Sequence, residues 1–262
     1  MDDPRFWPIS GINLAATHLT AYSNNDSLAE ATGFFFKHND VKYLVTNRHV
    51  IVDESDGYYP NRIEMYLHTS RTDAKLNRGV SVDLYSENAP SWFEHPRYDE
   101  NICDVVLLPL QEELIARCII NFMTTDNIPP AHYRFPAFCQ VAVVGYPLGF
   151  YDQVNNLPIY RNAMVASPYP HDFEDKPAFL IDAVLHEGTS GAMVLNSPSN
   201  LIVDTRNGAT FHTDSAILFG IHSAEMIVGG EPLGLNTVWH ARLLPEIANS
   251  QLPGTIRTAA SP

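Results

Sequence analysis

The sequence has 262 residues, of which 45% are hydrophobic and 18% are charged, and its formal net charge is −14. This composition excludes a disordered chain and allows a packed core without metals or disulfides. Because such an acidic surface repels phosphate backbones, we expect no general nucleic-acid binding.

The cysteines and the N-terminus indicate the compartment. Cys103, Cys118 and Cys139 are odd in number, lack metal-ligand spacing and lie in apolar stretches, as free thiols in a protein core do. A reducing, cytoplasmic location is therefore expected. The N-terminus lacks the pattern of a signal peptide, and no apolar stretch has the length of a membrane span, so no membrane partner is expected.

Short runs of Val, Ile, Phe and Tyr, bounded by Gly, Pro, Asn and Asp, predict that the chain is built mainly from strands. The predicted strands, in chain order, are 32–37, 42–46, 62–68, 80–85, 104–109, 140–145, 163–167, 179–185, 192–195, 216–222 and 235–237. Helical periodicity is ambiguous at 111–122, and 238–248 is predicted as a terminal helix. Strands without long helices between them favour an antiparallel barrel or sandwich, an all-β fold.

The Asn127-Ile128-Pro129-Pro130 stretch is the best candidate for a linker between two halves. We therefore expect an N-terminal segment at 1–30, a first β-barrel at 31–125, and a second β-barrel at 126–262. The first barrel would carry His49 and Asp104, and the second would carry Ser190 and the substrate pocket.

Three residues stand beside apolar strands in the order His, Asp, Ser, which is one known arrangement of a catalytic triad. His49 follows a strand, and Asp104 begins another, where an ionised carboxylate is costly without a partner. Ser190 lies in a turn between two glycines. Each residue alone is more often structural, so the prediction depends on their joint occurrence.

The competing carboxylates for the aspartate role are Asp83, Asp99 and Glu100, of which the last two lie in a polar, solvated run.

Two other catalytic patterns fit poorly. The His186-Glu187 pair begins like a zinc-protease motif, but Ser190 stands where the second histidine is needed. The nucleophile elbow Gly-x-Ser-x-Gly would need glycine where the chain has Ala192. We expect no metal and no cofactor.

Several motifs together resemble the bacterial trypsin-like serine peptidases of the chymotrypsin fold. They are Thr32-Gly33-Phe34-Phe35, Leu44-Val45-Thr46-Asn47-Arg48-His49, His95-Pro96, Asp104-Val105-Val106, Gly145-Tyr146-Pro147, Ile181-Asp182-Ala183 and Gly188-Thr189-Ser190-Gly191. The resemblance implies two antiparallel six-stranded β-barrels with a short C-terminal helix. It also implies that His49 is the base, Asp104 its orienting partner and Ser190 the nucleophile, with the N–H groups of Gly188 and Ser190 as the oxyanion hole.

The motif around the serine departs from the family at two positions. Family members often carry Pro where this chain has Glu187, and Asp or Asn where it has Thr189. In trypsin the residue before the serine is an Asp that pairs with the N-terminus created by activation. Because Thr189 cannot form that ion pair, the oxyanion turn has to be held in another way.

The resemblance also implies the walls of the primary substrate pocket. They would be formed by Val184, Leu185 and His186, with Gly220, His222 and Ser223 opposite. The Gly220-Ile221-His222 element resembles the pocket strand of glutamyl endopeptidases and viral 3C-like proteases, where the matching His binds a Glu or Gln side chain. The alternative is a buried His222 bonded to the backbone, beside a mainly apolar pocket.

Two further features bear on that pocket. Leu185 stands where glutamyl endopeptidases have a hydroxyl residue that assists the histidine. Val184 stands where an acid would select Arg or Lys, so that preference is not expected.

Three functions remain open at the level of sequence. The first is an active endopeptidase that acts on proteins or peptides. The second is a catalytically weak or inactive peptide-binding module on a protease scaffold. The third is a peptidase kept quiescent until a regulatory protein partner arrives, with residues 1–30 as the contact.

Overall fold

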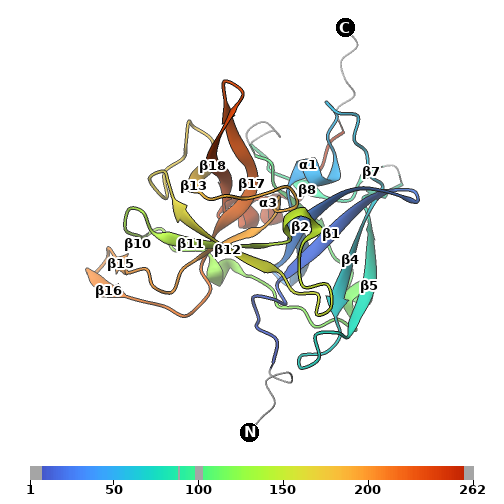
Figure 1. Cartoon of the computed structure of the whole chain (residues 1–262), viewed down its shortest axis with the longest axis horizontal. Coiled ribbons are helices and arrows are strands. Elements are labelled where there is room, and N and C mark those ends of the chain that lie inside the picture. Colours follow the sequence, from blue (N-terminus) through green and yellow to red (C-terminus); the bar gives the residue numbers. More distant parts are fainter. Residues whose placement is uncertain (1–7, 88, 98–102, 257–262) are drawn as a thin grey trace.

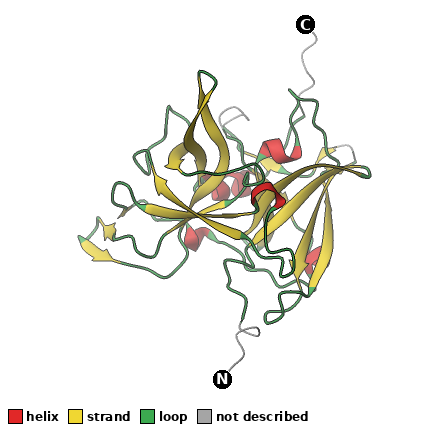
Figure 2. Cartoon of the chain, in the orientation of Figure 1, coloured by secondary structure: helices red, strands yellow, loops and turns green. Residues whose placement is uncertain are grey.

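The structure is a computed structural model that describes residues 8–87, 89–97 and 103–256. Figure 1 shows two groups of strands facing each other, with the N-terminal strands in one group and most of the C-terminal strands in the other. Figure 2 shows that helices contribute only a few short turns. The described part of the chain is therefore a β protein of two halves.

The first half is one antiparallel sheet of eight strands in the order β19-β8-β9-β3-β2-β1-β4-β5. Its strands are β1 (Ala16–Ser23), β2 (Asp26–His38), β3 (Val41–Thr46), β4 (Arg62–His68), β5 (Asn77–Asp83), β8 (Phe93–Glu94), β9 (Val106–Pro109) and β19 (Leu252–Pro253). Strand β2 is buried on both faces at its Phe run. Phe35 packs into the core of the sheet, while Phe34 and Phe36 pack into a second cluster on the opposite face.

The second half is a closed antiparallel barrel in the order β11-β12-β13-β18-β17-β14. Its strands are β11 (Gln140–Gly145), β12 (Ile159–Val165), β13 (Ala178–Asp182), β14 (Met193–Asn196), β17 (Leu218–Val228) and β18 (Glu231–His240). Inward-facing side chains such as Val143, Phe179 and Phe219 form its core. Beside it lies a three-stranded sheet of β10 (Tyr133–Arg134), β15 (Ile202–Asp204) and β16 (Ala209–Phe211).

The remaining elements are short. They are the helices α1 (Arg48–Ile51), α2 (Glu112–Ile115) and α3 (Leu243–Ser250), the 3₁₀ turns Thr125–Asn127 and Pro147–Gly149, and the paired strands β6 (Tyr85–Ser86) and β7 (Ala89–Pro90). No helix in the described ranges is long and apolar enough to cross a membrane.

One apolar cluster joins the two halves. Phe34 and Phe36 of β2 contribute to it from the first half, Met193 and Ile221 from the second, and Leu244 from α3. Burial of this shared apolar surface favours a fixed arrangement of the two halves. The groove where they meet is therefore a defined place for side chains from both.

The all-β class, the closed six-stranded barrel and the C-terminal helix are confirmed. The helix was predicted to begin too early, because Val238 and Trp239 pair with β13 as part of β18. The first half contains eight strands, and its closure into a six-stranded barrel remains a prediction.

The domain boundaries also remain predictions, but strands pair across two of them. Strand β1 lies within the predicted segment 1–30 and pairs with β2 and β4. Strand β19, from the predicted second half, pairs with β8 of the first. Backbone pairing therefore connects both ends of the described chain to the first sheet.

Candidate active site

Helix α1 carries His49, and a buried ion-pair network holds this helix in place. Arg48 Nη2 lies 2.7 Å from Glu54 Oε1, and Arg48 Nε lies 3.0 Å from Glu94 Oε1. Burial alone would lower the pKa of Arg48, but the two carboxylates raise it above the ordinary value, so the guanidinium stays charged. Arg48 also donates to the carbonyl of Thr255, which ties the C-terminal segment to the same helix.

Asp104 stands just before β9 and accepts three hydrogen bonds. Its Oδ2 accepts from His49 Nδ1 at 2.6 Å and from Ser223 Oγ at 2.8 Å, and its Oδ1 accepts from the His49 backbone N–H at 3.0 Å. These donors provide the partners that a carboxylate beside an apolar strand requires. Asn47 Nδ2 donates to the Asp104 carbonyl at 2.7 Å, which fixes the backbone there as well.

The charge of Asp104 governs the protonation of His49. Burial would lower the pKa of the imidazole, but the charge and hydrogen bond of Asp104 raise it above its ordinary value, with a further contribution from Asp53. Because Oδ2 can only accept, the proton lies on Nδ1 and leaves Nε2 unprotonated in the neutral ring. The neutral His49 therefore has a free lone pair on the side away from Asp104.

The competing carboxylates do not take this position. Asp83 is exposed at the end of β5, at the sheet edge, while Asp99 and Glu100 lie outside the described residues.

Ser190 lies in the turn before β14 and lines the same cleft as His49. Its hydroxyl donates to the backbone carbonyl of Ser223 at 3.0 Å. The hydroxyl proton thus points at Ser223 rather than at His49 in this arrangement. Rotation about the Cα–Cβ bond is the movement that would redirect the Oγ toward the imidazole.

The glycines on either side of Ser190 are required by space and conformation. Gly188 has φ +86°, and a Cβ there would lie 2.6 Å from the Tyr146 carbonyl oxygen. Gly191 has φ +84°, and a Cβ there would lie 2.1 Å from the Thr32 carbonyl oxygen. Only glycine adopts this backbone at such close approach without strain.

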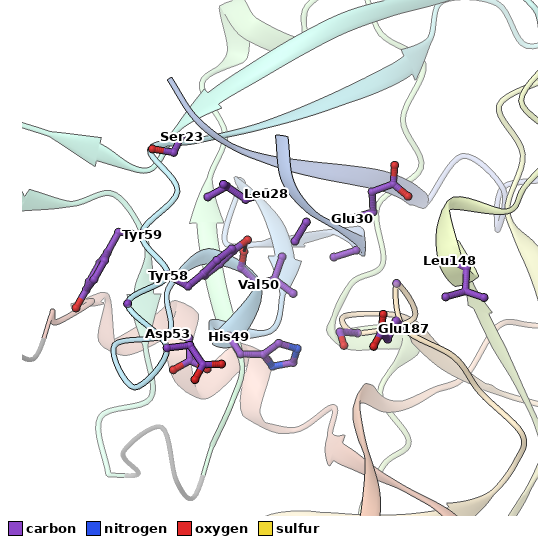
Figure 3. A pocket seen from close by; sticks show the side chains of 16 residues that line it. Ser23, Leu28, Glu30, His49, Val50, Asp53, Tyr58, Tyr59, Leu148 and Glu187 are labelled. Carbon is purple, nitrogen blue, oxygen red and sulfur yellow. Dashed lines mark hydrogen bonds between the residues drawn. The ribbon is translucent and has the colours of Figure 1, made fainter. Parts of the chain in front are cut away.

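The larger part of the cleft is lined by His49 and Ser190 and has a volume of about 1100 Å³. Among the described residues its lining includes the carboxylates of Glu30, Asp53, Asp56 and Glu187, and no Lys or Arg. Figure 3 shows Asp53 beside His49 on one wall, with Glu187 across the gap. This part of the cleft is therefore strongly negative.

The smaller part, of about 570 Å³, shares His49, Leu148, Glu187 and Ser190 with the first. Four of the predicted pocket residues line it, namely Leu185, His186, His222 and Ser223, and so does the carboxylate of Glu225. Val184 and Gly220 are not among its lining residues. The Val184 side chain is 67% exposed, and Gly220 packs against the Trp239 carbonyl within the barrel.

His222 is buried, and both of its ring nitrogens have protein partners. Nδ1 lies 3.0 Å from the Thr189 carbonyl oxygen, and Nε2 lies 3.2 Å from Asn236 Oδ1. Burial lowers the pKa of His222, so the ring is neutral at neutral pH. Both oxygens only accept, so the single proton of the neutral ring serves one of them, and the shorter contact assigns it to Nδ1.

Asn236 was missed by sequence reasoning. It is 2% exposed, lies within β18 and donates to the Ala183 carbonyl at 2.7 Å. The only sequence signal was a polar amide inside a predicted apolar strand.

Among the described residues, no three His, Cys, Asp or Glu side chains converge as a metal site requires. The three cysteines are unpaired, and burial raises the pKa of Cys139 to about 11.

The family model described as a trypsin-like peptidase domain matches residues 31–202. No curated protein matches the sequence significantly.

Two solved structures illustrate the fold. The serine endoprotease of Yersinia pestis is 15% identical with a TM-score of 0.53, and the match covers 91% of this chain and 62% of that protein. The HtrA-type protease AlgW, determined with a tripeptide, is 16% identical with a TM-score of 0.53, and the match covers 92% of this chain and 63% of that protein. This chain thus spans less than two thirds of either relative, and at these identities the likeness concerns the fold alone.

Proposed function

The chain belongs to the trypsin-like peptidase family, and we propose that it is a serine endopeptidase with His49, Asp104 and Ser190 as its catalytic triad. The observation that carries the proposal is the 2.6 Å contact between Asp104 and His49, in a cleft that Ser190 also lines. His49 and Asp104 are 55 residues apart along the chain, and Asp104 and Ser190 are 86 apart. Three distant segments thus supply a base, its orienting carboxylate and a nucleophile to one groove.

The proposed reaction begins with attack of the Ser190 Oγ on the carbonyl carbon of a peptide bond. His49 Nε2 accepts the hydroxyl proton as the bond forms, and later delivers it to the leaving amine. Asp104 keeps the imidazole in the required tautomer and stabilises the imidazolium. The backbone N–H groups of Gly188 and Ser190 donate to the oxyanion of the tetrahedral intermediate. Water then attacks the acyl-enzyme while His49 accepts its proton. The acid product leaves, and His49 returns the proton to Ser190 Oγ.

The smaller part of the cleft would hold the side chain that precedes the cleaved bond. The carboxylates of Glu187 and Glu225 line it, so a substrate Glu would be repelled. The one N–H of the neutral His222 ring is directed to the Thr189 carbonyl and Nε2 has no proton, which disfavours His222 as a donor to substrate. We therefore propose Gln or a small apolar side chain at this position in preference to Glu, while the two carboxylates leave Lys and Arg open as alternatives.

Val184 lies outside this pocket, so its side chain does not exclude Arg or Lys there. Substrates that differ only at this position, with Gln, Ala, Glu and Lys in turn, would measure the preference directly. A clear preference for Glu would contradict the proposed selectivity.

The larger, negative part of the cleft would hold the residues that follow the cleaved bond. It shares His49 and Ser190 with the smaller part but is lined by residues 28–31 of β2 and by the segment 53–59 instead of by β17, so we assign it to the leaving-amine side. Carboxylates without a neighbouring Lys or Arg favour a cationic ligand. We therefore propose protein substrates with Lys or Arg shortly after the cleaved bond.

A peptide-binding module without activity is the competing function. The resting orientation of the Ser190 hydroxyl toward Ser223 is compatible with it. The test is to digest a peptide library derived from a denatured proteome with the intact chain and with Ser190→Ala. New peptide ends that the intact chain produces, and Ser190→Ala does not, support the proposal. Tight peptide binding by both proteins without any cleavage would favour the binding module instead.

A further inference from the structure

Hydrolysis at this site requires the N–H groups of Gly188 and Ser190 to face the cleft. In a trans peptide the C=O and the N–H point in opposite directions, so a carbonyl held on the protein side directs the N–H of the same peptide outward. Thr189 provides no carboxylate to hold the turn through an ion pair. The contacts of the turn's carbonyl oxygens therefore show what holds it.

Four consecutive carbonyl oxygens, from Glu187 to Ser190, each accept a hydrogen bond from outside the turn. The Glu187 carbonyl accepts from Leu148 N at 2.6 Å, and the Gly188 carbonyl accepts from Thr32 Oγ1 at 2.7 Å. The Thr189 carbonyl accepts from His222 Nδ1 at 3.0 Å, and the Ser190 carbonyl accepts from Thr32 N at 3.0 Å. Of the donor groups, only Thr32 Oγ1 and His222 Nδ1 belong to side chains. Leu148 N and His222 Nδ1 hold the two peptides that carry the N–H groups of Gly188 and Ser190. Thr32 supplies the other two bonds, to the Gly188–Thr189 and Ser190–Gly191 peptides, which alternate with them along the chain.

Thr32 lies in β2, in the first half of the protein, and is completely buried. Its hydroxyl oxygen accepts from the Tyr146 backbone N–H at 2.9 Å, so the hydroxyl proton is directed to the Gly188 carbonyl. Its own carbonyl accepts from Thr46 Oγ1 at 2.9 Å. The residue is thus fixed on every polar atom, and it joins the sheet of the first half to the turn of the second.

We propose that Thr32 is a positioning residue that holds the oxyanion turn, in the place of the ion pair that Thr189 cannot make. The proposal rests on the peptidase function proposed above. Thr32 touches no substrate and acts through the Gly188–Thr189 peptide and the Ser190 carbonyl.

Removal of the hydroxyl has a specific physical consequence. Thr32→Val keeps the shape of the side chain but leaves the Gly188 carbonyl and the Tyr146 N–H buried without their partner. Gly188 is the residue best able to change its backbone angles, so the Gly188–Thr189 peptide reorients toward another donor. This peptide joins the two peptides that carry the oxyanion N–H groups, so its reorientation displaces both donors from the transition state, while ground-state contacts of the substrate elsewhere in the cleft remain.

The kinetic test compares Thr32→Val with Thr32→Ser and with Thr17→Val. Thr17 is also a buried strand threonine, but its hydroxyl contacts the neighbouring His18 carbonyl and not the turn. We expect Thr32→Val to lower kcat about 10- to 100-fold, less than the loss of a whole oxyanion donor, with KM within about threefold. Thr32→Ser should restore most of kcat, and Thr17→Val should keep it. Equal kcat for Thr32→Val and Thr17→Val would overturn the proposal.

A second measurement does not depend on activity and separates this proposal from the function it rests on. Backbone ¹⁵N relaxation dispersion is recorded for the Thr189 amide, which belongs to the peptide that Thr32 holds, in Ser190→Ala with and without Thr32→Val. We expect microsecond-to-millisecond exchange at Thr189 only when the Thr32 hydroxyl is absent. Unchanged relaxation would refute the positioning role. Absence of all cleavage by the intact chain would refute the peptidase function, whereas the relaxation result would still decide the role of Thr32.

Discussion

Substitution of Asp104 by Asn tests the proposed division of roles in the triad. Asp104 accepts from the His49 backbone N–H on Oδ1, and from His49 Nδ1 and Ser223 Oγ on Oδ2. An asparagine has only one oxygen. If that oxygen keeps the His49 N–H bond, the NH₂ group faces Nδ1 and can only donate, so the imidazole proton moves to Nε2. The ring then has no lone pair for the Ser190 proton.

The expected loss in kcat is about 10⁴-fold, the size seen for the equivalent change in a studied serine protease, or about 5.5 kcal/mol of transition-state stabilisation. The assay is kcat on a fluorogenic peptide at neutral pH, with the folded fraction checked by thermal unfolding. Asp53→Asn is the matched control, because this carboxylate acts on His49 only by its charge. A kcat for Asp104→Asn within tenfold of the intact chain would refute the reasoning.

Three further predictions concern charge. Because the pKa of His49 is raised, kcat/KM should be lost as pH falls through a value above that of ordinary imidazole. Asp53→Asn removes a negative charge near His49, so this acid limb of the pH profile should move to lower pH. An unmoved limb would argue against an electrostatic effect of Asp53 on His49. The negative part of the cleft predicts a higher kcat/KM for substrates with Lys or Arg after the cleaved bond than for the same substrates with Gln there. This preference should shrink with added salt and in Asp56→Asn. A preference that salt does not change would contradict an electrostatic origin. Arg48→Met removes the cation between two mostly buried carboxylates, Glu54 and Glu94. It should lower the free energy of unfolding, measured by urea denaturation, by about 3–5 kcal/mol. A change under about 1 kcal/mol would show that water solvates these carboxylates.

The sequence allowed the main chemical groups to be predicted because each carries a local signal. His49, Asp104 and Ser190 stand next to apolar strands, and the glycines beside the serine mark a turn that other residues cannot adopt. Their convergence was an inference from chain order. The contact between His49 and Asp104 agrees with it, while the hydroxyl of Ser190 is turned toward Ser223.

The groups that sequence reasoning missed act through partners distant along the chain. Thr32 was quoted only as part of a motif, and its contact with Gly188 spans 156 positions. Asn236 carried no pattern that indicates a His222 partner. Such hydrogen bonds depend on how the two halves pack, which local propensity does not encode.

The errors in the fold predicted from the sequence also arise from contacts between residues distant along the chain. Strand β1 was missed because its inward residues include small alanines such as Ala21, and its pairing with β2 and β4 decides its state. The predicted helix start at residue 238 failed because the ladder to β13 includes Trp239. In both cases tertiary pairing overrides the local signal.

The central claim is that Ser190 is a nucleophile activated by His49. The most direct measurement is reaction of the folded chain with a fluorophosphonate, followed by mass spectrometry to locate the adduct. We expect a single adduct on Ser190, formed far more slowly in His49→Ala and not at all in Ser190→Ala. A folded chain that leaves Ser190 unmodified, or that is modified equally fast without His49, would contradict it.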